Sequence, residues 1–297
     1  MTGAERGFLL LTSQLGDPKR KPLSVAQLRD LQLCVGNRSC EEPDRDVTAA
    51  DLRALGYDSS AAQHIINLLE DTALLEYYLQ RAKKAGCMPI TRATAVYPAT
   101  LRKRLGTDCP GTLWAKGDAS VLNLPAVALV GSRDLQSENA AFAIEVGRQA
   151  AQQGYVLVSG NARGADKLAQ NACLEAGGRV ISVVADCLQD HAMRENVLYL
   201  SENEFDEAFS ALRALSRNRV IHCLGQVTLV AQSGYRTGGT WNGTEKNLRH
   251  GWSPVCCFAD GGLAQRTLTD MGALAVDFTD LEDLPKLCLG NQTLFDE

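Results

Sequence analysis

The sequence lacks any apolar run long enough to cross a bilayer. Its longest runs, such as Ala126–Val130, fall far short of the roughly 18 residues that a membrane span needs. The first residues also lack the small-residue cleavage pattern of a signal peptide. The apolar share of 45% and the charged share of 22% of the 297 residues exclude a disordered, collagen-like or coiled-coil chain. We therefore expect a cytoplasmic, globular protein of about two domains with no membrane partner.

Metal-ligand spacing is also missing. Ten cysteines are scattered without a single C-x-x-C pair, and the four histidines have no ligand spacing relative to them. A structural zinc site needs clustered ligands, so we expect reduced thiols, no metal and no cofactor. A large positive charge is absent too, because the formal net charge is −5. Any contact with nucleic acid must then come from a local basic patch.

The chain divides into three parts by its pattern. Residues 1–86 predict a small helical domain, with helices near 23–31 and 48–56 and one long amphipathic helix from Ser60 through Leu79. Residues 87–125 are rich in turn formers and predict a connector with short strands that leads into a sheet. Residues 126–297 alternate between apolar strand patterns and amphipathic helix patterns.

This alternation predicts an α/β fold with a doubly wound, mostly parallel sheet. The expected strands lie at 126–130, 155–158, 179–184, 197–200, 227–230, 255–258 and 274–276. The expected helices lie at 137–153, 165–176, 206–224, 241–249 and 262–271.

Three turns that follow predicted strands are rich in glycine and small hydroxyl residues, and each contains an arginine. Their notable members are Gly131, Ser132 and Arg133 in the first turn, Ser159, Gly160, Arg163, Gly164 and Asp166 in the second, and Gly234, Arg236, Gly238, Gly239 and Thr240 in the third. Glycine lets the backbone approach an anion, the following helix presents free N–H groups, and arginine pairs with phosphate. Because ligands bind at the carboxyl ends of parallel strands, these turns predict a site for a phosphate-containing ligand.

Two familiar phosphate motifs are absent. Neither G-x-G-x-x-G after the first strand of the sheet nor G-x-x-x-x-G-K-[ST] occurs, which disfavours a nicotinamide dehydrogenase and a P-loop ATPase. A further feature is Arg217-Asn218-Arg219 within a predicted helix. The two arginines are two residues apart and point in different directions, so one can face the ligand while the other pairs structurally. Asn218 can bond a loop or a base edge.

The segments AVALVGSR (126–133), VLVSGNARGAD (156–166) and RNRVI (217–221), in this order, resemble the DNA-processing protein A family, also called DprA or Smf. Residues 97–101 and 113–118 resemble its YPxxL and LYxxGD segments. The resemblance covers about residues 23–260. It implies a helical domain of the sterile-alpha-motif or helix-hairpin-helix type before a Rossmann-like domain.

The resemblance also implies a function. Members bind single-stranded DNA, form homodimers and help to load a RecA-type recombinase during natural transformation. On this chain the DNA-binding set implied by the resemblance and the turns is Gly131, Ser132, Arg133, Ser159, Gly160, Arg163, Gly164, Lys167, Arg217, Asn218, Arg219, Gly234, Gly238, Gly239 and Thr240. Asp166 is expected to brace its turn, because a carboxylate repels phosphate. No catalytic residue is expected.

Three departures mark a divergent member. Gln170 stands where the family's D-x-x-A-H pattern ends in histidine, and residues 229–247 replace its VVEAxxxSGSLxTA segment. The roughly 40 residues after 258 also leave no room for the family's frequent winged-helix domain. A role in defence or regulation is therefore an alternative to transformation.

Two alternative functions stay open. Gly238–Glu245 resembles the PGGxGTxxE phosphate turn of the LONELY GUY phosphoribohydrolases, which implies that Glu245 activates water in cleaving a nucleoside monophosphate. Glu245 can equally be an acidic residue in a helix's first turn, and Trp241 and Tyr235 can stack on bases. The chain can also be a regulatory interaction module that senses a nucleotide or single-stranded DNA. The sequence does not separate a DNA strand from a free nucleotide as the ligand.

Overall fold

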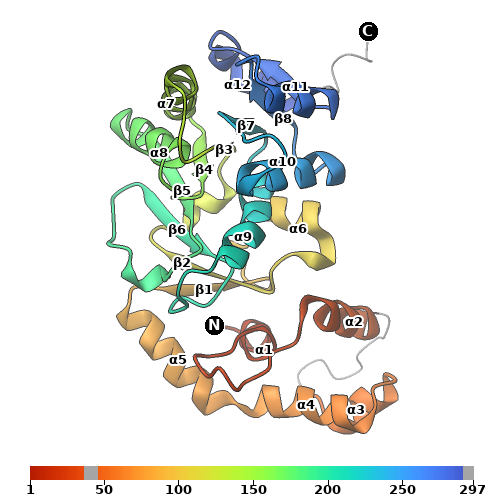
Figure 1. The fold of residues 1–297 in the computed structure, drawn as a ribbon. Coiled ribbons are helices and arrows are strands. Elements are labelled where there is room, and N and C mark those ends of the chain that lie inside the picture. The colour runs from red at the N-terminus through yellow and green to blue at the C-terminus, as the bar shows by residue number, and fades with distance from the viewer. Residues whose placement is uncertain (37–45, 290–297) are drawn as a thin grey trace.

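The computed structural model describes residues 1–36 and 46–289. Within them, nine strands form one mixed sheet with helices on both faces (Figure 1). The strand order is β1-β2-β6-β5-β4-β3-β7-β8-β9. Their bounds are Met88–Thr91 (β1), Thr112–Lys116 (β2), Ala126–Val130 (β3), Val156–Ser159 (β4), Arg179–Val183 (β5), Val197–Ser201 (β6), Thr228–Val230 (β7), Val255–Phe258 (β8) and Leu274–Val276 (β9).

The sheet is doubly wound and mostly parallel, which confirms the predicted fold class. Strands β6, β5, β4, β3, β7, β8 and β9 pair in parallel, whereas β1 and β2 add an antiparallel edge. From β3 the chain first builds toward β6 and then crosses over to β7 on the other side of β3. The β3–β7 junction is therefore the topological switch point, where open α/β sheets leave a crevice for ligands.

Apolar residues cover both faces of the sheet. Val127 and Leu129 of β3 join one buried cluster, and Ala128 and Val130 join the other, as the alternation of a strand requires. Helices α7 and α8 pack on the first face, and α6, α9 and α10 lie on the second (Figure 1). Helix bounds in this part are Ala99–Leu105 (α6), Ser137–Gln152 (α7), Ala165–Glu175 (α8), Ala211–Leu224 (α9), Gly238–His250 (α10), Leu263–Asp270 (α11) and Leu284–Leu289 (α12).

The amino-terminal part is helical. Its helices are α1 (Gly3–Thr12), α2 (Val25–Gly36), α3 (Ala49–Ala54), α4 (Ser59–Glu70) and α5 (Thr72–Lys84). Helices α3 and α4 share a small apolar cluster. Leu9 of α1 and Tyr78 of α5 instead belong to the cluster on the first face of the sheet, which also contains Val127 and Leu129. The helical part is thus docked onto β1 and β2, which come from the predicted connector (Figure 1). The division at residues 86 and 125 stays a prediction.

Three predicted helices have different bounds in the structure. The single helix expected from Ser60 through Leu79 is interrupted at Asp71, whose ψ of 37° leaves the helical region. Arg20 stabilises the break, because its Nη2 donates to the Leu68 carbonyl (2.9 Å) and its Nε to Asp71 (2.8 Å). Helix α9 begins at Ala211 rather than near 206, after the Ser210 cap, and α10 begins at Gly238 rather than near 241.

Nine cysteines in the described residues are free thiols; Cys40 lies outside them. No cluster of three or more His, Cys, Asp or Glu side chains there could hold a metal ion. Among the described helices, none combines the length and the hydropathy that a membrane span requires.

Candidate nucleic-acid interface

A cavity of about 660 Å³ opens at the switch point, a size typical of small-molecule sites. It is bordered by the turns after β3 and β7, by the start of α8, and by α9 and α10. Ten predicted site residues line it: Gly131, Ser132, Arg133, Asp166, Arg217, Asn218, Gly234, Gly238, Gly239 and Thr240. The structure thus brings residues from three separate turns and one helix together.

Two of the glycine-rich turns interlock with each other. A Cβ at Gly131 would lie 2.4 Å from the Ala165 Cβ, and one at Gly164, whose φ is +87°, would lie 2.4 Å from the Arg133 carbonyl oxygen. The Ala165 N–H donates to the Ser132 carbonyl at 3.2 Å. These glycines therefore allow the turns after β3 and β4 to contact each other, and one N–H donor and one carbonyl of the two turns bond to each other there.

Arg217 forms a buried part of the cavity wall. Its side chain donates from Nη1 to the Val183 carbonyl at 2.9 Å, and the residue is only 7% exposed. A Cβ at Gly160 would lie 1.8 Å from Arg217 Nη1 and 2.7 Å from Asp166 Oδ2, so both groups close over that glycine. Burial lowers the pKa of Arg217, while the nearby Asp166 opposes that shift. This arginine is positioned to hold the wall of the cavity together.

Asp166 bonds to the backbone of the turn after β4. It accepts a hydrogen bond from the Ala162 N–H at 3.1 Å. Burial raises the pKa of its carboxyl, and the charge of Arg217 and backbone N–H groups lower it. The carboxylate is thus directed at the turn after β4.

Arg133 is the accessible cation of the cavity. Its side chain is exposed and lines the opening, and it has no ion pair or side-chain hydrogen bond within the described residues. It lies close enough to Arg217 to lower the pKa of that residue. Arg163 lies outside the lining residues, where it pairs with Asp134 at 2.7 Å. Lys167, also outside the lining, donates to the Asn161 side chain, and burial lowers its pKa.

The start of α10 also lines the cavity. Its N-cap, Thr237, makes no side-chain cap hydrogen bond. The first turn of any helix has N–H groups without intrahelical partners, and the helix dipole makes this end positive. Asn218 of α9 positions this turn, because its Nδ2 donates to the Gly239 carbonyl at 3.1 Å.

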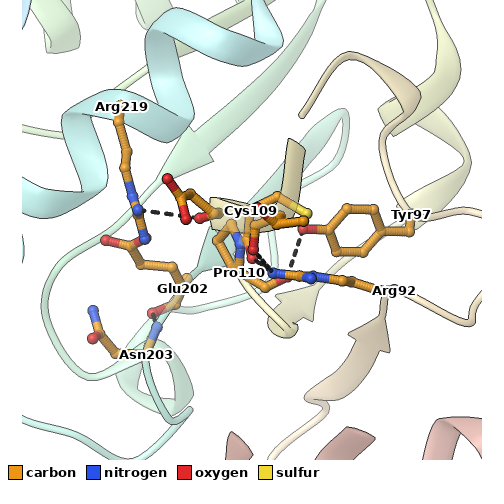
Figure 2. Close-up of polar contacts among 10 residues, drawn as sticks. Arg92, Tyr97, Cys109, Pro110, Glu202, Asn203 and Arg219 are labelled. Carbon is orange, nitrogen blue, oxygen red and sulfur yellow. Dashed lines mark hydrogen bonds and ion pairs between the residues drawn. The ribbon is translucent and has the colours of Figure 1, made fainter. Parts of the chain in front are cut away.

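Arg219 points away from the cavity. Figure 2 shows its side chain reaching Glu202, which it contacts at 3.0 Å. Beside this pair, Tyr97 donates to the Pro110 carbonyl at 2.6 Å and Arg92 donates to the Cys109 carbonyl (Figure 2). Arg217 and Arg219 thus face different directions, and Arg219 holds α9 against the β6 end of the sheet.

Ser159 also lies outside the lining. It is fully buried, and its Oγ accepts a hydrogen bond from Gln170 Nε2 at 2.7 Å. The same nitrogen reaches Ser182 Oγ at 3.3 Å. Gln170, the departure from the family pattern, therefore ties β4 to β5 through their serines.

The structure does not place Glu245 in the cavity, where the hydrolase alternative requires it, and it exposes only one of the two aromatic residues considered for base stacking. Glu245 lies outside the lining and pairs with Arg249 at 3.3 Å, one turn along α10. Trp241 is only 4% exposed and packs in the apolar cluster below α10, so the stacking role considered for it is wrong. Tyr235 is exposed, and the Arg236 guanidinium lies 5.3 Å from its ring centre.

Two features of the cavity were missed from the sequence. One is an apolar wall formed by Phe209, Ala211, Ala214 and Leu215. It was not predicted, because the pattern at 206–224 indicates a helix but not which of its faces stays uncovered. His222 also lines the cavity. A polar residue next to an apolar run was its only sequence signal.

His222 is a buried, neutral side chain whose Nε2 has no hydrogen-bond partner among the described residues. Burial lowers its pKa to about 3. Asn247 Oδ1 accepts from the Ser253 N–H at 2.9 Å, which directs Asn247 Nδ2 toward His222 Nδ1 at 3.2 Å. Nδ1 is therefore the acceptor, and Nε2 carries the proton.

Comparison with known proteins assigns the family. The model of the family described as DNA recombination-mediator protein A matches residues 89–251. The DNA processing protein DprA of Bacillus subtilis is 26% identical over 209 residues, which are 66% of this chain and 70% of that protein. The Streptococcus pneumoniae DprA is 34% identical over 142 residues, 44% of this chain and half of that protein.

Solved structures show the same fold. The crystal structure of DprA from S. pneumoniae aligns with a TM-score of 0.71 at 23% identity, over 96% of this chain and 98% of that one. A structure describing the single-stranded DNA binding mode of DNA processing protein A from Helicobacter pylori aligns with a TM-score of 0.56 at 22% identity, over 68% and 95% of the two chains. Since the family model covers more than half of the 297 residues, this chain belongs to the DNA recombination-mediator protein A family.

Proposed function

We propose that this chain binds single-stranded DNA in the cavity at the β3–β7 switch point and performs no catalysis. One observation carries the proposal: Arg133, exposed and without an ion pair among the described residues, faces the same cavity as the amino terminus of α10. Both are typical phosphate-binding groups. Membership in the family and the single-stranded DNA binding mode described for the H. pylori protein support a DNA strand as the ligand.

The residues divide into two roles under this proposal. Arg133 and the first turn of α10 contact phosphates. Arg217 and Asp166 keep the turns in place, since both are only 7% exposed. Phosphate contacts position a strand without reading its sequence, so binding should depend weakly on sequence at these residues.

Fluorescence anisotropy of a labelled oligo-dT strand tests this proposal. Affinity should fall between about 50 mM and about 200 mM salt, because phosphate contacts release counterions. Arg133→Ala should weaken binding and reduce the slope of log affinity against log salt concentration by about 1, the value for one phosphate contact. The control is Arg148→Ala, which removes the same charge from α7, where Arg148 pairs with Glu145. An Arg133→Ala affinity equal to that of Arg148→Ala would refute the assignment.

We further propose the finer role that the family suggests. The chain would act in the cytoplasm as a homodimer that protects single strands and helps to load a RecA-type recombinase, in DNA uptake, recombination or defence. Sedimentation of the protein alone measures its mass. Strand exchange by a recombinase on strands covered by a single-strand-binding protein measures loading, and no stimulation by this chain would refute that part.

A further inference from the structure

The cavity has an apolar wall beside its phosphate-binding groups, since a Cβ at Gly239 would lie 3.7 Å from Leu215 Cδ2. Phe209, just before α9, and Ala211, Ala214 and Leu215 on its first turns form this wall. Phe209 is 57% exposed and Leu215 is 43% exposed. An aromatic ring at the edge of a cavity is a feature that folding alone does not require.

The exposure of Phe209 follows from the start of α9. Ser210 is the N-cap, so Phe209 precedes the cap and Ala214 is the fourth helical residue. An apolar residue before the cap normally packs against that fourth residue. Here the partner is alanine, whose single methyl group is too small to cover a phenyl ring. The ring therefore remains available to a ligand.

The segment that carries Phe209 is held in place. Ser210 Oγ accepts from the Arg213 N–H at 3.1 Å. The Arg213 guanidinium pairs with Glu207 and donates to the Ala208 carbonyl, and both of these residues precede Phe209 in the chain. Ordering this segment on binding should therefore lose little conformational entropy.

We propose that Phe209 is a stacking platform for one base of the bound strand. The inference rests on the proposed function. A nucleotide is charged at its phosphate and flat and apolar at its base. The lining of the cavity offers Arg133 and the α10 amino terminus for the phosphate, and Phe209 with Leu215 for the base. This arrangement fits one nucleotide, with its phosphate toward α10 and its base on the ring. Stacking of this kind tolerates every base.

Anisotropy with two labelled strands of equal length, oligo-dT and an abasic strand, tests the platform. Phe209→Ala should weaken oligo-dT binding by about 5-fold to about 150-fold, and Phe209→Trp should restore it. The abasic strand keeps the phosphates and should bind wild type and Phe209→Ala equally. Leu212→Ala is the matched control, since Leu212 is 78% exposed on the same helix but lies outside the cavity lining.

The outcomes separate the two proposals. If wild type binds no strand, the proposed function and the platform both fall. If wild type binds and Arg133→Ala weakens binding while Phe209→Ala does not, the platform alone falls. Equal losses for oligo-dT and the abasic strand would also overturn it. A change of mass in sedimentation for both Phe209→Ala and Leu212→Ala would instead assign the patch to a contact between copies of the chain.

Discussion

Removal of Arg217 should destabilise the fold before it affects any ligand. Arg217→Ala leaves the Val183 carbonyl without the 2.9 Å hydrogen bond and leaves Asp166 without the opposing charge that most lowers its pKa. An unmade buried hydrogen bond costs about 1–3 kcal/mol, and the charge of Asp166 left without compensation adds to this loss. At an unfolding entropy of about 2.1 cal/mol/K per residue, each kcal/mol shifts the melting temperature of 297 residues by about 1.6 °C, so we expect a fall of roughly 2–5 °C.

The dependence on Asp166 gives this prediction a specific signature. Burial already raises the pKa of Asp166, and loss of Arg217 should raise it further. A raised carboxyl pKa in the fold penalises the charged form at neutral pH, and the penalty disappears as pH falls and the group becomes protonated. The stability gap between wild type and Arg217→Ala should therefore narrow from pH 7.5 to pH 5.5. Adding Asp166→Asn should recover part of the loss.

Urea unfolding followed by circular dichroism measures all four members of this mutant cycle. A coupling free energy near zero between the two substitutions would refute the reasoning. So would an Arg217→Ala protein as stable as wild type that has lost oligo-dT binding, since Arg217 would then contact the strand directly.

Three further predictions concern single residues. Because the pKa of His222 is lowered to about 3, the free energy of unfolding should decrease as pH falls below about 6.5, by about 2 kcal/mol between pH 7.5 and pH 5.0. Urea unfolding should show that this decrease is absent in His222→Gln and kept in His250→Gln. Arg219→Ala leaves Glu202, whose side chain is 5% exposed, without its partner, so the melting temperature should fall while oligo-dT affinity of the folded protein stays within about twofold. A Cβ at Gly239 meets nothing nearer than 3.5 Å, so Gly239→Ala should fold normally; weaker oligo-dT binding by anisotropy would follow from a methyl group at the phosphate wall, and unchanged binding would contradict that placement.

The sheet was predictable because each strand carries a strong local signal. The five apolar residues of β3 are buried on both faces, and this pattern needs no tertiary information to be recognised. The break between α4 and α5 was not predictable, because it depends on Arg20, about 50 residues away in sequence. Local amphipathic patterning continues through Asp71, and only a long-range contact interrupts it.

The location of the site was predictable for a similar reason, but the orientation of its side chains was not. Parallel strands end at one edge, so the turns after β3 and β7 had to meet there. Which arginine of Arg217-Asn218-Arg219 faces the cavity depends on how α9 is rotated against the sheet. The exposure of Phe209 depends in turn on the small size of Ala214, a detail of packing rather than of periodicity.

The three glycine-rich turns differ in how many of their N–H donors already have partners within the protein. In the turns after β3 and β4, the Ser132 N–H donates to Gln232, the Ala165 N–H to Ser132 and the Ala162 N–H to Asp166, so these donors are already engaged within the protein. The glycines there allow the close approach of the two turns. Helices α8 and α10 both begin without a side-chain cap, but the first N–H of α8, at Ala165, already donates to Ser132. Since an anion binds where N–H groups lack partners, we expect the phosphate at the start of α10, within the segment that departs most from the family pattern.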